Sequence, residues 1–100
     1  MTQLVIDADT HLTEPADLWT SRVPSKWGDL VPHVRFHERR QEDYWYVGDR
    51  KLYGAGAFAQ AGWPEFPPSH PRTLDQAVPA AVDPEARLAY MDEMGIYYQV

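Results

Sequence analysis

The first alternating stretch of the chain covers residues 3–11, and it predicts a strand. Because strand side chains point to the two faces in turn, one face here is apolar or small. The opposite face starts apolar and becomes ionisable toward its C-terminal end, with Asp7, Asp9 and His11. Such a row is either a solvent-facing edge or the edge of an active site.

The next part of the pattern predicts a short helix, an antiparallel meander and a long loop. Residues 16–22 are expected to be helical, and a further helical turn is expected to be capped by Ser25. Residues 33–53 favour two or three strands with a tight turn at Gly48-Asp49, because aromatic and β-branched residues dominate there. Residues 54–82 are rich in Gly, Ala and Pro and predict an irregular loop.

The last part of the chain predicts a well-bounded helix and a second strand. Asp83 is typical of an N-cap with proline after it, and Gly95 is typical of the left-handed stop. Leu88 and Met91 mark the side that we expect to pack. The run at 96–100 is rich in strand-forming residues, so a new strand is expected there.

Composition limits the compartment and the chemistry. No apolar run approaches the ~18 residues of a membrane span, and the first residues lack the basic start of a secretory signal. There are no cysteines, which excludes disulfides, thiolate metal ligands and a cysteine nucleophile. We therefore expect a cytoplasmic protein with no membrane partner.

The charge pattern disfavours nucleic acid as a partner. The net charge is −6, and the basic pairs Arg39-Arg40 and Arg50-Lys51 are interspersed with acidic residues. Nucleic-acid binding requires a positive face. A small-molecule substrate is the expected partner instead.

Asp9 and His11 carry the candidate chemistry. On a strand, residues two apart project to the same side, so a carboxylate oxygen and an imidazole nitrogen can both reach one divalent cation. Asp7 lies one step deeper and is better placed to orient a ligand than to be one. Taken alone, this spacing is a weak motif that is also common in solvent-facing strands.

Two segments resemble the amidohydrolase-related family, which includes aminocarboxymuconate-semialdehyde decarboxylase and related hydrolases. Val5–Pro15, which reads Val-Ile-Asp-Ala-Asp-Thr-His-Leu-Thr-Glu-Pro, is similar to the first strand of that family. Asp83–Ile96 resembles its first helix leading to strand two, and the turn at Trp45–Gly48 is a weaker similarity. The resemblance covers both ends of the chain well and the middle poorly.

The resemblance implies an α/β fold, the N-terminal part of a TIM-like (β/α)8 barrel, with a divalent metal at the C-terminal end of its strands. Asp9 and His11 match the two ligands on the first strand, where the family often has two histidines. Zinc is the first expectation, but the harder oxygen of Asp9 also admits manganese or magnesium. Glu14 matches the glutamate of the family's Glu-Pro step. It either contacts the ligand network or caps the end of the strand.

In this interpretation, residues 1–100 are a fragment of one barrel domain: strand one, an insert at about 12–82, helix one and the start of strand two. The other ligands would come from later strands, so the fragment alone is expected to be inactive. The insert would lie on the catalytic face as a lid, a substrate wall or a subunit contact of a homo-oligomer. Trp63, Phe66 and His70 are then candidates to line a pocket for an aromatic acid, although plain loop packing also explains them.

Two functions of different class follow. In the first, the parent protein is a metal-dependent hydrolase or a non-oxidative decarboxylase that acts on a small carboxylic acid, amide or ester. The metal would polarise the substrate or lower the pKa of a water molecule. In the second, the chain is a stand-alone binding or assembly module with the meander as its surface. An apolar final strand disfavours the second, because an uncovered strand edge invites aggregation.

Overall fold

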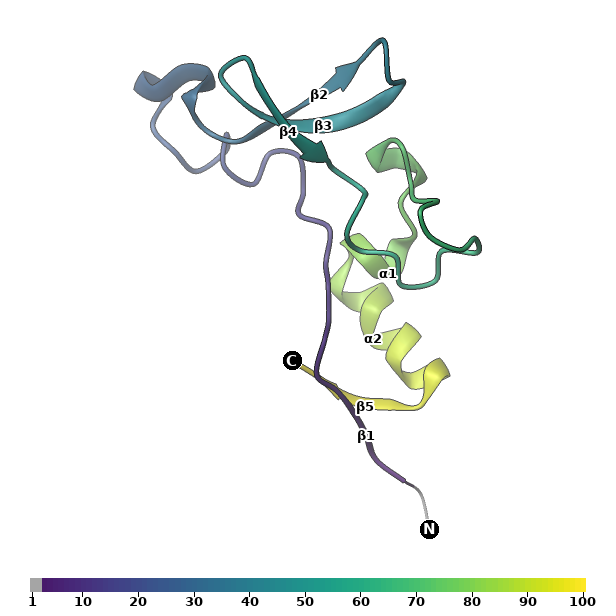
Figure 1. The fold of residues 1–100 in the computed structure, drawn as a ribbon. Coiled ribbons are helices and arrows are strands. Elements are labelled where there is room, and N and C mark those ends of the chain that lie inside the picture. Colours follow the sequence, from purple (N-terminus) through teal and green to yellow (C-terminus); the bar gives the residue numbers. More distant parts are fainter. Residues whose placement is uncertain (1–2) are drawn as a thin grey trace.

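Two small sheets lie in different parts of an elongated chain (Figure 1). The computed structural model describes residues 3–100, and its principal extents are 55 × 30 × 19 Å. One sheet has two parallel strands and the other has three antiparallel strands. The chain is therefore a small mixed α/β structure in which no barrel is closed among the described residues.

The parallel sheet joins the two ends of the chain. Strand β1 (Val5–Asp7) pairs with β5 (Ile96–Gln99), and the Val100 amide also donates to the Asp7 carbonyl at 2.9 Å. The predicted strand over 3–11 was too long. It ends at Asp7 because the carboxylate of this residue accepts the amide of Asp9 at 3.1 Å, a local bond that competes with strand pairing.

Helix α2 (Pro84–Met94) connects toward β5 and has the predicted boundaries. The Asp83 carboxylate accepts the Glu85 amide at 3.2 Å, and Gly95 has the left-handed φ of 74°. The expected packing face was wrong at Leu88, which is 62% exposed, whereas Met91 is half-buried and the buried residue of α2 is Arg87. The helix turns Arg87 toward backbone carbonyls, which rotates Leu88 outward. None of the helices within residues 3–100 has the length and apolarity to cross a membrane.

The antiparallel sheet confirms the predicted meander. Strands β2 (His33–His37), β3 (Glu42–Val47) and β4 (Arg50–Gly54) pair in that order. The predicted turn lies between β3 and β4, where Gly48 has a positive φ of 57°. The aromatic run in β3 forms most of the apolar core here, with Trp45 3% exposed and Tyr46 buried.

The first connection, between β1 and β2, contains turns and a 3-10 helix. Residues 16–22, predicted as a helix, form turns instead: their backbone bonds alternate between three- and four-residue spacing and never build a continuous ladder. The next helical segment, η1 (Ser25–Leu30), exists, but Ser25 does not cap it. Pro24 occupies the cap position, which makes Ser25 the first helical residue, and no side chain caps this helix.

The second connection, between β4 and α2, is largely irregular, as predicted, but contains two short helices. These are η2 (Leu74–Gln76) and α1 (Pro79–Val82), and α1 lies beside α2 (Figure 1). A helix of one turn is too short to leave a periodic pattern in the sequence. The Thr13 amide donates to the Ala81 carbonyl at 2.8 Å, so the two connections meet at α1.

Candidate metal site at the end of strand β1

Asp9 and His11 meet just beyond the C-terminal end of β1. The Asp9 carboxylate Oδ1 lies 3.2 Å from the His11 imidazole Nε2. Their side chains are 91% and 58% exposed, so an ion can approach from solvent. The structure thus brings together the two residues that the sequence selected as ligands, even though the strand has ended before them.

Local hydrogen bonds hold the backbone on both sides of this pair. The Asp9 amide donates to Asp7 Oδ1, and Arg87 Nη2 donates to the His11 carbonyl at 2.9 Å. Gln99 joins the two supports: its Nε2 donates to Asp7 Oδ2 at 3.1 Å, and its Oε1 accepts Arg87 Nη1 at 3.2 Å. Asp7 therefore orients the backbone before Asp9, whereas the sequence suggested that it would orient the ligand side chains.

The pair borders a hollow of about 240 Å³ whose walls come from β1, α2 and β5. Asp7, Asp9 and Arg87 are its charged residues, and His11 adds the imidazole. Two carboxylates thus face one guanidinium, so the hollow is net negative when His11 is neutral. Arg87 does not neutralise Asp9, because its donors are directed to the carbonyls of Ala80 and His11 and to Gln99.

The separation of the two donor atoms fits a shared cation. Ligands at 2.0–2.2 Å from a tetrahedral ion lie roughly 3.4 Å from each other, close to the 3.2 Å between Asp9 Oδ1 and His11 Nε2. No group of three or more His, Cys, Asp or Glu residues that could hold a metal occurs in the described range. The described residues thus offer two donor groups here, whereas a catalytic zinc site typically takes about three from the protein.

Glu14 shares a second hollow with His11. This hollow has a volume of about 340 Å³, and Tyr53 and Phe58 form its aromatic wall. Their rings meet edge to face with centroids 5.2 Å apart. The sequence did not point to Tyr53 or Phe58, because one closes the meander and the other opens the irregular loop, and only the fold brings both to His11.

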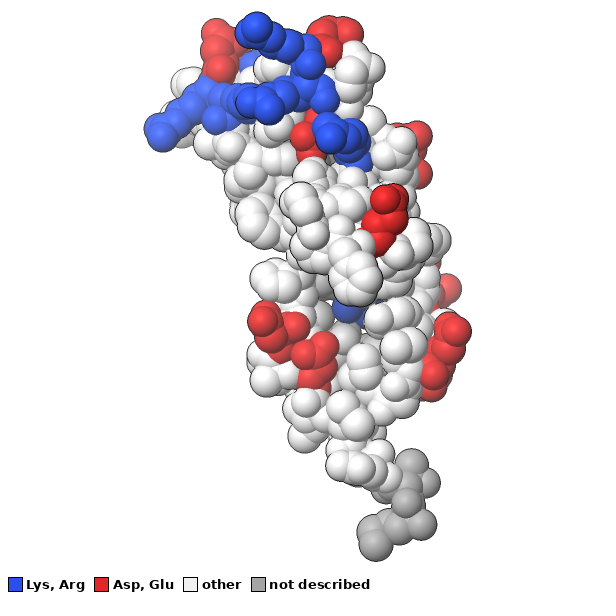
Figure 2. Space-filling model, turned by 45° about the vertical axis from the view of Figure 1, so that its right-hand side comes forward, with Lys and Arg blue, Asp and Glu red and all other residues white. Residues whose placement is uncertain are grey.

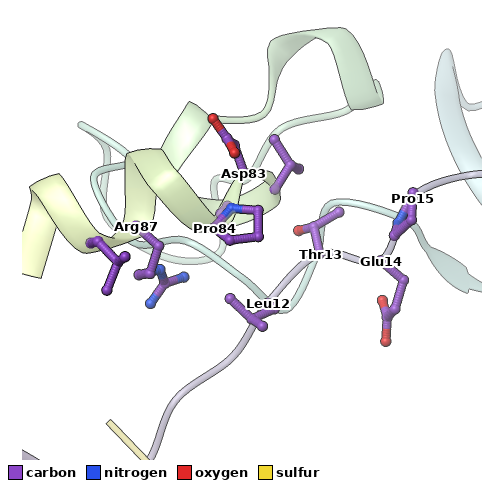
Figure 3. A pocket seen from close by; sticks show the side chains of 10 residues that line it. Leu12, Thr13, Glu14, Pro15, Asp83, Pro84 and Arg87 are labelled. Carbon is purple, nitrogen blue, oxygen red and sulfur yellow. The ribbon is translucent and has the colours of Figure 1, made fainter. Parts of the chain in front are cut away.

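An apolar groove lies on the other side of this segment (Figure 3). Its volume is about 510 Å³, and it runs between residues 12–15 and the start of α2. Leu12 and Pro84 contribute apolar surface, while the Glu14 carboxylate is directed away from Asp83 (Figure 3). Glu14 has no hydrogen-bonding or ion-pairing side-chain partner within residues 3–100, so its carboxylate is free to face a ligand.

The three residues suggested for the substrate pocket have other surroundings. Trp63 donates its indole N–H to the Ser69 hydroxyl at 3.1 Å, and Phe66 is almost fully exposed. His70 bonds the carboxylate of Glu42 on strand β3. None of the three lines either hollow that contains His11.

The Glu42–His70 pair anchors the long loop to the antiparallel sheet. Glu42 is 5% exposed, so its charge needs a partner. Burial lowers the pKa of His70, but bonds to Glu42 and to the Pro68 carbonyl, with the charge of Glu42, outweigh it and raise the pKa above 6.5. Burial and then the bond to Glu42 raise the pKa of the Tyr44 phenol. The sequence gave no sign of this pairing, because Glu42 and His70 are 28 residues apart.

The chain has no match among protein-family models, curated proteins or solved structures. The resemblance of Val5–Pro15 and Asp83–Ile96 to amidohydrolase-related proteins therefore stays a prediction. The geometry of Asp9, His11 and the hydrogen bonds that hold their backbone does not depend on this resemblance.

Proposed function

We propose that this chain supplies two metal ligands, Asp9 and His11, to a metal-dependent hydrolase or non-oxidative decarboxylase of the amidohydrolase-related type. The observation that carries the proposal is the 3.2 Å approach of Asp9 Oδ1 to His11 Nε2 at an exposed strand end. An acid and an imidazole at this separation fit one divalent ion.

The position of the pair in the topology supports a TIM-like barrel. Strands β1 and β5 are parallel and α2 leads into β5, which is the repeating unit of a (β/α)8 barrel. Active sites of such barrels lie at the C-terminal ends of the strands. The pair lies at that end of β1, and residues 12–82 extend from the same end (Figure 1).

Exposed apolar side chains on the parallel sheet and on helix α2 support the same proposal. Ile6, Tyr97 and Leu88 are all more than half exposed. Parallel sheets are normally covered on both faces, because their connecting helices lie there. Further strands and helices of a barrel would cover these side chains.

The residues of the chain have distinct roles in this proposal. Asp9 and His11 would hold the ion, with zinc favoured and manganese or magnesium admitted by the carboxylate. Asp7 and Arg87 position the backbone on either side of them. The bound ion would polarise a substrate oxygen or acidify a water molecule.

The second hollow suggests the substrate class. Tyr53 and Phe58 offer an aromatic wall beside His11, which suits a small aromatic carboxylic acid, amide or ester. Glu14 lies in the same hollow, where it could take or give a proton. A cytoplasmic location is part of this proposal, as the sequence composition suggests.

The test is calorimetric titration of the full chain with zinc at neutral pH. Asp9→Ala and His11→Ala are each expected to weaken binding by about tenfold or more, the effect of losing one of two ligands. His70→Ala is the matched control, because it removes the imidazole of the other carboxylate–imidazole pair. Native-like zinc affinity in both site variants, or loss only in His70→Ala, would overturn the proposal.

A further inference from the structure

Four basic residues line one hollow at the end of the antiparallel sheet. Its volume is about 410 Å³, and its lining residues are His37, Arg39, Arg40 and Lys51. Figure 2 shows that Lys and Arg side chains gather at this end of the molecule. The chain as a whole has a net charge of −6, so this concentration of positive charge runs against its overall balance.

The sheet creates this hollow from residues that are separated in the sequence. His37 ends β2, the two arginines lie in the turn that follows, and Lys51 belongs to β4. Along the sequence they are interspersed with acidic residues. Pairing of β3 with both neighbouring strands brings the basic side chains to one place, and turns acidic residues such as Glu42 inward.

Among the residues that the structure describes, no acidic side chain forms an ion pair with a cation of this hollow. The ion pairs within residues 3–100 are His11–Asp9, Arg35–Asp49 and His70–Glu42. None of these involves a residue of the hollow, and Glu38 in the same turn pairs with none of its cations. Like charges held close together repel each other, so an anion bound among them would be stabilised.

The turn that carries the arginines is fixed by its own hydrogen bonds. Gln41 adopts a positive φ of 54°, which is unfavourable for a residue with a side chain. Its amide donates to the His37 carbonyl at 2.8 Å, and its Nε2 donates to the Glu38 carbonyl at 2.7 Å. The arginines therefore start from a backbone that is already ordered, which lowers the entropic cost of binding.

Hydrogen bonding also leaves the His37 ring with a donor nitrogen. The Arg40 amide donates to His37 Nδ1 at 3.1 Å, so Nδ1 is an acceptor. The neutral ring must then carry its proton on Nε2. Every side chain that lines the hollow is thus a hydrogen-bond donor.

Tyr44 forms a neutral support between two of these donors. Lys51 Nζ lies 4.8 Å from the centroid of the Tyr44 ring, and the His37 ring lies 5.7 Å from it. The Tyr44 phenol is uncharged at neutral pH, and burial raises its pKa further, so the ring adds no negative charge of its own.

We propose that the hollow lined by His37, Arg39, Arg40 and Lys51 binds a phosphate-type oxyanion, either free phosphate or the phosphoryl group of a small phosphate monoester. One arginine guanidinium can donate to two phosphate oxygens at once, and the Lys51 ammonium group adds a point charge. The volume exceeds that of phosphate alone, so an ester substituent also fits. A small hollow on an acidic protein suits a small anion better than a nucleic-acid backbone.

The test is titration of the full chain with inorganic phosphate and with phenyl phosphate, followed by backbone amide NMR at low ionic strength. Saturable shifts are expected at residues 37–41 and 51. Arg40→Gln and Lys51→Gln should each weaken binding by about tenfold, the loss of one charge-assisted contact. Lys26→Gln, which removes an exposed charge on η1, is the matched control and should bind as the native chain does.

The two ligands distinguish the two sources of the anion. Similar affinities indicate a site for free phosphate, and phenyl phosphate binding about tenfold more tightly indicates an ester site. Shifts that do not saturate, or that are equal in all variants, would overturn the proposal. So would an oligonucleotide that binds more tightly than both ligands. The result is independent of the metal site, because Asp9→Ala should leave phosphate binding unchanged.

Discussion

The antiparallel sheet and the parallel β1–α2–β5 unit use their hydrophobic residues in opposite ways. In the antiparallel sheet, β3 buries Trp45 and Tyr46. In the parallel unit, the buried residue of the helix is Arg87, and apolar residues such as Leu88 and Ile6 face solvent. The first region buries the aromatic side chains of its central strand, while the second leaves large apolar side chains exposed.

This difference shows what the hydrophobic pattern of a segment measures. The pattern in β3 predicted burial that the meander itself provides. The pattern in α2 is equally apolar at Leu88 and Met91, but the described residues offer no surface that covers Leu88. An apolar position in a periodic pattern is therefore not by itself evidence that the side chain is buried by its own neighbours in the sequence.

Replacing the central aromatic residue of the antiparallel sheet should have the largest effect. Trp45→Ala is expected to lower the free energy of unfolding by about 3–5 kcal/mol, because it leaves a cavity in the core. Urea denaturation followed by circular dichroism measures it. Trp27→Ala is the control, since Trp27 is half exposed on η1 and its loss should cost far less. Equal costs at the two positions would remove the distinction between core and surface.

Removing the buried Arg87 side chain of the parallel unit should have the next largest effect on the free energy of unfolding. Arg87→Met is expected to cost about 2–3 kcal/mol, because it leaves the carbonyls of Ala80 and His11 without their donor. The same denaturation experiment measures it, with Arg22→Met on an exposed turn as the control. A variant as stable as the native chain would show that this hydrogen-bond network does not hold the unit together.

A smaller effect should appear in the pH dependence of the stability that the Glu42–His70 pair contributes. The folded-state pKa of His70 is raised above 6.5, so its stabilising contribution is complete below 6.5 and is lost as pH rises through the folded value. The difference in Tm between the native chain and His70→Gln should therefore shrink from about pH 5 to about pH 9. His33→Gln, which has no carboxylate partner, should show no such trend. A difference that grows with pH would contradict the pairing with Glu42.

The smallest effect is expected on the outer face of α2. Leu88→Ser should change the free energy of unfolding by no more than about 0.5 kcal/mol, because the side chain is mostly exposed. The measurement is denaturation combined with sedimentation to record the state of association. A cost of about 2 kcal/mol or more would mean that this face is covered in solution, and would weaken the contrast between the two regions.

Local signals made much of the fold predictable. The cap at Asp83 and the stop at Gly95 bound α2 correctly, because both act within a few residues. The turn at Gly48 likewise separates β3 from β4. The length of β1 was not predictable by alternation, because the Asp7 side chain ends the strand by bonding its own backbone. Alternation reports which side a residue faces, not whether pairing continues.

The candidate site was predictable only in its nearest parts. Asp9 and His11 are two residues apart, so their approach follows from local geometry. The supports from Arg87 and Gln99 come from more than 70 residues away, and no spacing in the sequence links them to His11. The aromatic wall of Tyr53 and Phe58 was missed for the same reason, and the basic hollow was hidden by the acidic residues between its members.

The bond between the Thr13 amide and the Ala81 carbonyl holds together the two ends of the long segment between them, which is called the excursion here. Both residues are buried, so the excursion leaves and returns at one fixed point. Each doubling of the length of a flexible loop adds only about 0.6 kcal/mol to the cost of bringing its ends together. The excursion can therefore grow, shrink or be exchanged over evolution and remodel the surface around His11, while Arg87 and Asp7 keep the strand end itself in place.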